Sequence, residues 1–207
     1  MKVLQIILVL IVIIGVIVVG VSLVNNTDEK MENVVDATNI DVQESKEELN
    51  LQNVDEMMSF IDKIYVGLEL FPSLTSTEMP LTDIDMLTYE TGITSTDKID
   101  NVVVSMPMMS SQAYSLVIVK VKDKNDADSV AKEMSENINP NKWVCVSAEK
   151  IYATSSGNIA FLVMTNTEMA ESVYESFKTN AGKCGPEYII ENALEEVPAY
   201  DAEITLE

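Results

Sequence analysis

The segment VIVKVKDKNDADSV, Val117–Val130, is followed 43 residues later by a segment with the same pattern, AFLVMTNTEMAESV, Ala160–Val173. Each begins with apolar residues at every second position, as in a β-strand, and continues through a polar stretch into apolar residues at helical spacing. Three of the 14 positions are identical, so the repeat lies in the pattern more than in the identities. The two segments therefore predict the same pair of elements, a strand followed by a helix.

The two predicted helices carry apolar stripes with identical spacing. Asp123 or Asn125 can cap the first helix, and Asn166 or Thr167 the second, because short polar side chains accept hydrogen bonds from free backbone N–H groups. The first stripe is Ala127, Val130, Ala131, Met134 and Ile138, and the second is Ala170, Val173, Tyr174, Phe177 and Ala181. A helix with one apolar face must pack that face against another element.

A further strand precedes each copy of the pattern. Asn101–Met106 and Trp143–Ala153 have strand character, and Ser155–Asn158 is typical of a hairpin turn because Gly157 accepts a positive φ. The repeated unit is therefore ββα. Two such units predict an α+β fold, in which a four-stranded antiparallel sheet from the duplicated unit has both helices on one face. About 130 residues suffice for one such core, which gives a domain at residues 53–183.

Residues that alternate with the helix-facing set point to the opposite face of the predicted sheet. They are Ile118, Lys120, Phe161 and Val163. Three of the four are apolar, and two interpretations are open. In the first, a helix that begins at Asn53 covers them. In the second, they form an exposed binding surface, on which Lys120 offers a basic spot to an acidic or amphipathic partner.

Two helices are predicted before the repeat. Asn53 and Glu56 have the spacing of a capping box. The apolar residues that follow recur at helical spacing and predict an amphipathic helix: Met57, Met58, Ile61, Ile64, Tyr65 and Leu68. Thr82–Glu90 predicts a short second helix, which Gly92 closes.

The chain starts with an uncharged apolar run of 22 residues, Val3–Val24. As a helix it would be roughly 33 Å long, enough for a bilayer core of about 30 Å. Lys2 precedes the run and acids follow it, so the positive-inside rule places the N-terminus in the cytoplasm and the chain from Asn25 onward outside. The alternative is a signal peptide cleaved after Gly20 and Ser22, although the run is longer than the usual apolar core of about 7–15 residues. The sequence predicts a single-pass membrane anchor, with the signal peptide left open.

Composition separates a linker, a domain and a tail. Residues 25–52 contain eight acids, two lysines and few apolar side chains, which is typical of an extended charged spacer. Residues 53–183 contain the predicted elements, and residues 184–207 form an acidic tail. The predicted order is anchor (1–24), linker, extracytoplasmic domain and tail.

The formal charge of −21 comes from 13 basic residues, all lysine, and 34 acids, and the chain has no histidine. Such a chain repels nucleic acid. Without histidine there is no imidazole base or Ser-His pair, and two cysteines are too few for a structural zinc site. No cofactor or metal is predicted. We expect a non-enzymatic binding or scaffolding domain with an unknown envelope protein or ligand as its partner. The alternative is a cell-envelope hydrolase that uses two carboxylates.

Two further segments of the sequence are candidate sites. Asp123–Asp128 resembles a calcium loop, but its sixth position is not glycine, and Met134 stands at the twelfth position, where a bidentate glutamate is needed. That segment is interpreted as a helix cap. Cys145 and Cys184 form an even pair in an extracytoplasmic chain, so a disulfide between them is left open. It would stabilise the fold by about 4 kcal/mol in the chain-entropy model.

Two stretches carry a family resemblance, MPMMSSQAYSLVIVKVKDKNDADSV (Met106–Val130) and KIYATSSGNIAFLVMTN (Lys150–Asn166). They resemble an uncharacterised family of extracytoplasmic domains, known mainly from Firmicutes and described as a domain of unknown function. Many members of that family look like lipoproteins with an N-terminal lipid-carrying cysteine. This chain has no cysteine near Val24, so the resemblance does not extend to a lipid anchor. It covers about Leu81–Lys178 and implies no catalytic residues.

Overall fold

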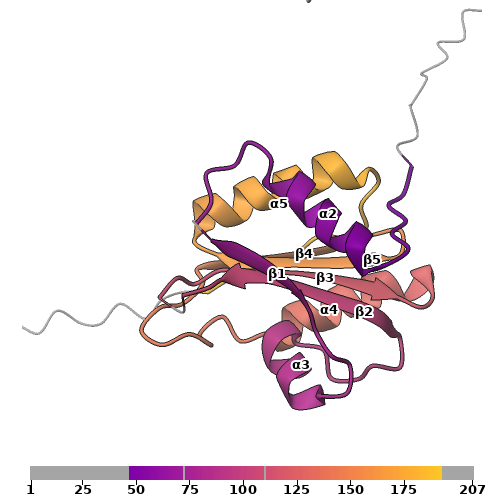
Figure 1. The fold of residues 1–207 in the computed structure, drawn as a ribbon, viewed down its shortest axis with the longest axis horizontal. Coiled ribbons are helices and arrows are strands. Elements are labelled where there is room, and N and C mark those ends of the chain that lie inside the picture. The colour runs from indigo at the N-terminus through magenta and orange to yellow at the C-terminus, as the bar shows by residue number, and fades with distance from the viewer. Residues whose placement is uncertain (1–46, 72, 110, 193–207) are drawn as a thin grey trace, which may run out of the picture. The chain divides into compact units, whose positions relative to one another are not determined.

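A six-stranded antiparallel sheet forms the centre of the part of the chain that the structure describes, residues 47–71, 73–109 and 111–192 (Figure 1). The structure is a computed structural model. The strands lie in the order β1-β2-β3-β5-β4-β6, and every neighbouring pair is antiparallel. Their bounds are β1 Leu74–Glu78, β2 Ile99–Pro107, β3 Ser115–Val121, β4 Lys150–Ser156, β5 Ile159–Thr165 and β6 Tyr188–Glu191. The two predicted copies therefore meet where β3 pairs with β5.

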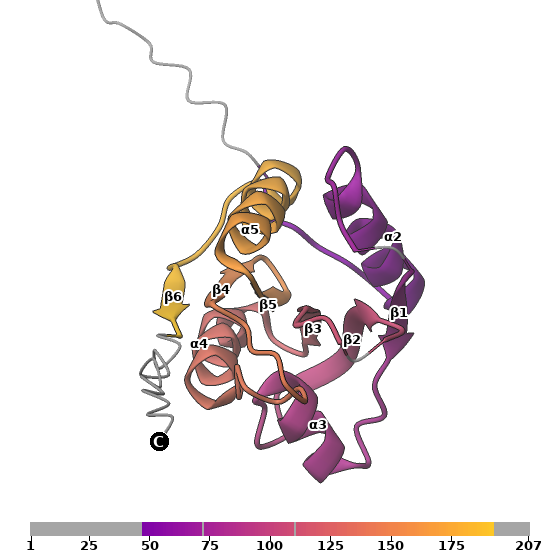
Figure 2. The same cartoon turned by 90° about the vertical axis from the view of Figure 1, so that its left-hand side faces the viewer.

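Helices cover both faces of this sheet. The helices are α2 Val54–Tyr65, α3 Ile84–Thr91, α4 Ala127–Asn137 and α5 Thr167–Ala181, and a 3-10 turn, η1 Lys124–Asp126, precedes α4. Figure 2 shows α2 and α5 on one side of the strands and α3 and α4 on the other. The described residues thus form three layers, with the sheet in the middle.

The predicted four-stranded sheet with both helices on one face is wrong in two respects. The strands β1 and β6 extend the sheet at its two edges, and α5 packs on the face opposite α4. The space beside α4 is filled by α3, whose Leu87 shares a buried cluster with Val102 and Val104 of β2. The helix α5 instead lies beside α2, where Phe177 meets Phe60 edge to face at a centroid distance of 5.9 Å.

Two buried clusters hold the helices to the sheet. Val117 and Val119 of β3 belong to the cluster under α3 and α4, whereas Leu116 and Ile118 belong to the cluster under α2 and α5. The strand is therefore buried on both faces, which a near-continuous apolar run favours. All ten residues of the two predicted helical stripes are buried, so the stripes are confirmed. Burial of one large apolar side chain contributes about 1.5–3 kcal/mol.

The predicted helix caps are largely confirmed. The side chain of Asn53 accepts a hydrogen bond from the backbone N–H of Glu56 at 3.0 Å, and the Glu56 carboxylate accepts one from Gln52 N–H at 2.8 Å. Gly92 ends α3 in the left-handed conformation, with φ of 77°. Asn166 caps α5 through its side-chain oxygen. These contacts satisfy backbone groups that a helix end leaves without partners.

The folded region extends beyond the predicted domain at both ends. Leu51, in the predicted linker, is buried in the core, and β6 lies within the predicted tail. Inside the domain, the predicted strand Trp143–Ala153 is wrong over its first half, because β4 begins at Lys150. The residues before Lys150 instead form the connection between α4 and β4.

The predicted membrane segment, Val3–Val24, lies outside the described residues, as does the linker up to residue 46. Among residues 47–192 no helix is long and apolar enough to cross a membrane. The single membrane helix in the predicted fold therefore finds no support in the part of the chain that the structure describes.

Candidate binding site

The sheet face that was a hypothetical binding surface is closed. Ile118, Phe161 and Val163 are fully buried beneath α2 and α5. The ammonium of Lys120 is ion-paired with the carboxylate of Asp100. Of the two interpretations left open, the structure agrees with the first, in which the helix after Asn53, α2, covers this face. The helix α5 covers it as well. Ile118, Lys120, Phe161 and Val163 therefore form no docking surface.

An apolar cleft of about 370 Å³ opens at the end of the sheet where β2 ends and where β3 and β4 begin. We call it the methionine cleft, and its apolar lining includes Tyr89, Met106, Met108, Met109, Trp143 and Val144. Four of the eight large apolar side chains that are exposed in the described residues line it. Of these, Met108 is 78% exposed and Val144 is 77% exposed. Half of the large apolar side chains that the described residues leave exposed thus gather at one place.

One wall of the cleft is the connection between β2 and β3, which is fixed at both ends. The strand β2 ends at Pro107, whose nitrogen has no hydrogen to donate to a ladder. Next to it, the N–H of Met108 donates to a backbone carbonyl ahead of β1 at 3.3 Å. Before β3 begins, the fully buried Tyr114 donates its hydroxyl hydrogen to Tyr65 at 2.9 Å. Met108 and Met109 therefore lie on a connection that is anchored on either side.

The other walls are the end of α3 and the connection from α4 to β4, and Lys142 joins them. Its Nζ lies 2.5 Å from Glu90 Oε2 and 3.4 Å from the Glu90 carbonyl oxygen. In return, the hydroxyl of Tyr89 donates to the Lys142 carbonyl at 2.7 Å. The Lys142 ammonium also lies 5.3 Å from the ring centroid of Trp143, within cation–π range. Because the Lys142 side chain is only 3% exposed, this junction is nearly dry.

The charges at this junction are balanced. Burial lowers the pKa of Lys142, and the charge and hydrogen bond of Glu90 oppose that change. Loss of one partner from a buried ion pair leaves the other charge without compensation, at a cost of about 3–5 kcal/mol. The pair is therefore suited to hold the walls at a fixed separation, as in ligand sites that are largely preformed.

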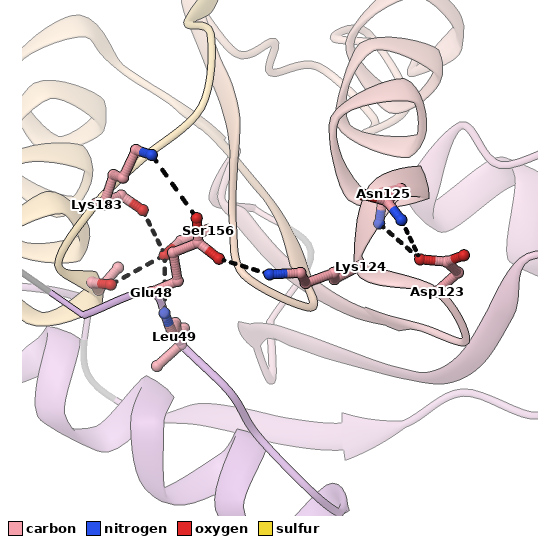
Figure 3. Close-up of polar contacts among 8 residues, drawn as sticks. Glu48, Leu49, Asp123, Lys124, Asn125, Ser156 and Lys183 are labelled. Carbon is pink, nitrogen blue, oxygen red and sulfur yellow. Dashed lines mark hydrogen bonds and ion pairs between the residues drawn. The ribbon is translucent and has the colours of Figure 1, made fainter.

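A second cleft, of about 270 Å³, lies beside the turn between β4 and β5 (Figure 3). The segment Glu48–Leu51, which we call the strap, is hydrogen-bonded to this turn, and its first residue, Glu48, lines the cleft. The Glu48 carboxylate lies between Lys124 Nζ at 3.2 Å and Lys183 Nζ at 3.8 Å. The hydrogen bond from Lys124 lowers the pKa of Glu48. Both lysines are mostly exposed, so these pairs contribute little to stability.

Hydrogen bonds along the hairpin fix the strap more firmly than its charges do. Leu49 N–H donates to Ser156 Oγ, and Leu49 C=O accepts from Asn158 N–H, both at 3.2 Å. The Asn158 side chain accepts from Leu51 N–H at 3.0 Å and donates to Leu51 C=O at 2.7 Å. At Gly157 a Cβ atom would lie 1.7 Å from the Leu49 oxygen. Four hydrogen bonds therefore hold the strap against the turn between β4 and β5.

The remaining predicted candidates have structural positions. Asp123 caps the 3-10 turn η1 by accepting from Asn125 N–H at 3.0 Å (Figure 3), whereas α4, the helix that it was expected to cap, begins after Asp126 without a side-chain cap. Cys145 is an exposed free thiol in the connection from α4 to β4 and not in a strand. Cys184 follows α5, with its sulfur 4.0 Å from the Gly182 oxygen. The Cys145–Cys184 disulfide is thus not formed in the structure.

These features define a small α+β domain with both sheet faces covered and one preformed apolar cleft. Residues 73–142 match the family model described as "Domain of unknown function (DUF4358)". The expected similarity to an uncharacterised domain family is confirmed over these residues, which include the β2–β3 wall of the cleft and Lys142. No curated protein and no solved structure matches the chain.

The sequence carried a signal for the methionine cleft that pattern analysis did not use. The run Met106-Pro-Met-Met109 places large apolar side chains at the end of a strand, where a polar turn is usual. Trp143 and Val144 were predicted to belong to a strand, so their side chains were expected to pack within the sheet. Large apolar residues in a connection, outside any helix or strand, are the feature that indicates an exposed apolar site.

Proposed function

We propose that the chain is a membrane-tethered, extracytoplasmic binding or scaffolding domain, not an enzyme, and that it takes its partner in the methionine cleft. The observation that carries this proposal is the exposure of Met108, Met109 and Val144 around one cleft. Both faces of the sheet are meanwhile fully packed. Exposed apolar patches of this kind mark interaction sites, and methionine and aromatic residues are enriched in them.

The tethering part of the proposal rests on the sequence before the described residues. The uncharged run Val3–Val24, with Lys2 before it and acids after it, supports an N-terminus in the cytoplasm and a domain outside. The resemblance to lipoprotein-like extracytoplasmic domains points to the same compartment. In this proposal the acidic residues 25–46 space the domain from the bilayer, and the strap fixes where the spacer joins it.

The proposal that the domain is not an enzyme is supported by the chemistry that the cleft offers. Glu90 is the one acid among the described residues that line it, and Glu90 is paired with Lys142. In the cleft beside the strap, Glu48 is paired with two lysines, and Asp128 accepts from the Tyr188 hydroxyl at 3.0 Å. The hydrolase alternative needs two facing carboxylates that are free to act, about 5–9 Å apart. Among the described residues that line these two clefts, no such pair of carboxylates supports the hydrolase alternative.

Site-specific photocrosslinking in intact cells tests the proposal. A crosslinking residue in place of Val144, 77% exposed and in the cleft, should capture one partner. Val66 is the matched control, because it is 78% exposed and follows α2 but does not line the cleft. Capture from Val144 should be lost when Met108 and Met109 are both changed to serine. Equal capture from both positions, or capture that survives the double change, would reject the cleft as the binding site.

Protease treatment of intact cells tests the compartment. If the domain lies outside the membrane, added protease should release a fragment that begins within residues 25–52. Recovery of the domain with the cytosol, protected from protease, would show that the proposed topology is wrong.

A further inference from the structure

We infer that the occupant of the methionine cleft is a cationic amphipathic segment of another protein, with large apolar side chains flanked by lysine or arginine. This inference rests on the proposed function and adds the chemistry of the partner. It follows from the size and lining of the cleft and from the charge around it.

The size and lining of the cleft fit a few apolar side chains. Its volume of about 370 Å³ lies near the lower end of the range for ligand sites, about 300–1,000 Å³. Methionine side chains are flexible and polarisable, so they adapt to aliphatic and aromatic groups of different shape. Trp143 and Tyr89 add rigid aromatic surface beside them. This combination suits anchor residues on a peptide segment.

The charge around the cleft selects a cationic partner. Among the described lining residues the one cation, Lys142, is 3% exposed and is neutralised by Glu90. The stretch that contains the α3 wall, residues 78–97, carries five acids and no lysine. The full chain has a formal charge of −21. No accessible lining cation is left to receive an anionic group, whereas the surrounding field attracts cations and speeds their encounter.

The negative charge around the cleft also disfavours three other occupants. A second copy of the chain brings another −21 charges to the interface. The chain's own residues 193–207 follow Asn192, whose side-chain amide donates hydrogen bonds to Asn141 and Ala148 of the connection that carries Trp143. They contain five acids and no lysine, however. An anionic lipid surface is repelled for the same reason.

Trp143 provides a direct readout, because it is the one tryptophan of the chain and it lines the cleft. The full chain in detergent micelles would be titrated with a tryptophan-free peptide that has leucine and phenylalanine anchors at helical spacing and lysine at both ends. The matched peptide has glutamate in place of lysine. We expect the lysine peptide to shift Trp143 emission with an affinity at least about tenfold higher, and the affinity to fall as salt screens the charges.

Two variants separate this inference from the proposed function. Val144→Ser should weaken the lysine peptide by about tenfold, and Val66→Ser should not change its affinity. If both peptides bind equally well and Val144→Ser weakens both, the cleft binds but the cationic partner is rejected. If neither peptide changes Trp143 emission, or Val144→Ser has no effect, the proposed function fails as well. A stronger response to anionic vesicles, or self-association that Val144→Ser abolishes, would also overturn the inference.

Discussion

Phe161 lies at the centre of the aromatic cluster between the sheet and α5. Its ring stacks on Phe177 at a centroid distance of 4.0 Å and lies 6.3 Å from Tyr174. Replacement by aspartate removes this packing and buries a charge without a partner, which costs at least about 3–5 kcal/mol. We expect Phe161→Asp to lower the melting temperature by roughly 6–20 °C, on a scale of about 2–4 °C per kcal/mol.

The matched variant is Met109→Asp. Met109 is 63% exposed, and surface changes usually stay within about 0.5 kcal/mol. Circular dichroism melting curves of the two variants should therefore differ widely. If Phe161→Asp melts like the wild type, the sheet face is open and the three-layer arrangement is wrong.

Tyr65 and Tyr114 make the domain sensitive to alkali. Burial raises the pKa of Tyr65 to about 12 and raises that of Tyr114 well above its ordinary value. Since the unfolded pKa is about 10, the folded state keeps protons that the unfolded state loses, and stability falls as pH rises from about 10 to 12. For Tyr65 alone the loss is about 2.7 kcal/mol.

Denaturant unfolding at a series of pH values measures this effect. The free energy of unfolding should decline above pH 10, roughly where tyrosines begin to ionise, and the tyrosinate absorbance that Tyr65→Phe removes should appear only as the chain unfolds. The decline should be shallower in Tyr65→Phe. A constant free energy of unfolding through pH 12, roughly two units above the ordinary tyrosine pKa, would contradict the buried position of these hydroxyls.

Among the connecting elements, the turn between β4 and β5 depends on one glycine. Gly157 has φ of 55°, and a Cβ atom there would lie 1.7 Å from the Leu49 oxygen of the strap. Gly67 is a natural control, because its φ is 79° but its Cβ position is open. Gly67→Ala should cost about 1 kcal/mol of backbone strain, whereas Gly157→Ala should cost more because the strap must also move. Equal melting temperatures for the two variants would show that the strap is not docked on the turn.

The junction between α3 and the connection from α4 to β4 depends on Glu90. Glu90→Gln leaves the nearly buried ammonium of Lys142 without its counter-ion, and we expect a loss of about 3–5 kcal/mol. Burial already lowers the pKa of Lys142, so the unfolded state binds more protons. Part of the loss should therefore be regained as pH rises toward about 10.

The control for that variant is Glu136→Gln. Glu136 pairs with Lys132 at 3.7 Å, but both side chains are more than half exposed, so no more than about 0.5 kcal/mol should be lost. Chemical unfolding of both variants at neutral and alkaline pH makes the comparison. A Glu90→Gln variant as stable as Glu136→Gln would mean that the pair does not hold the cleft walls.

At the scale of the whole molecule, the repeat predicted the four inner strands and the two helices that follow β3 and β5. The second apolar face of β3 and β5, with Ile118, Phe161 and Val163, was also visible and indicated that something covers it. The helix α5 helps to cover this face because α3 occupies the space beside α4 on the other face. No local sequence pattern shows where α3 packs. The edge strands were missed because β1 and β6 have 5 and 4 residues. Strands this short acquire their character from pairing with a neighbour.

The methionine cleft was missed for a related reason. Tyr89, Met109 and Trp143 come from three connections or element ends that are far apart in the sequence. Sequence periodicity describes the inside of an element, whereas such a cleft depends on which element ends meet. The lysine that joins its walls, Lys142, has no sequence signal that distinguishes it from the exposed lysines.

Hydrogen–deuterium exchange of the full chain, with and without the lysine-flanked peptide, is the most direct test of whether both faces of the sheet are closed and whether the partner binds in the methionine cleft. Backbone amides of β3 and β5 should exchange slowly in both states, because both faces of these strands are buried. Added protection should be confined to the segments that line the cleft, which are the end of α3 at Tyr89 and Glu90, residues 106–114 and residues 142–144. Fast exchange in β3 and β5, or protection that appears over α2 and α5 instead, would contradict both the closed sheet and the site.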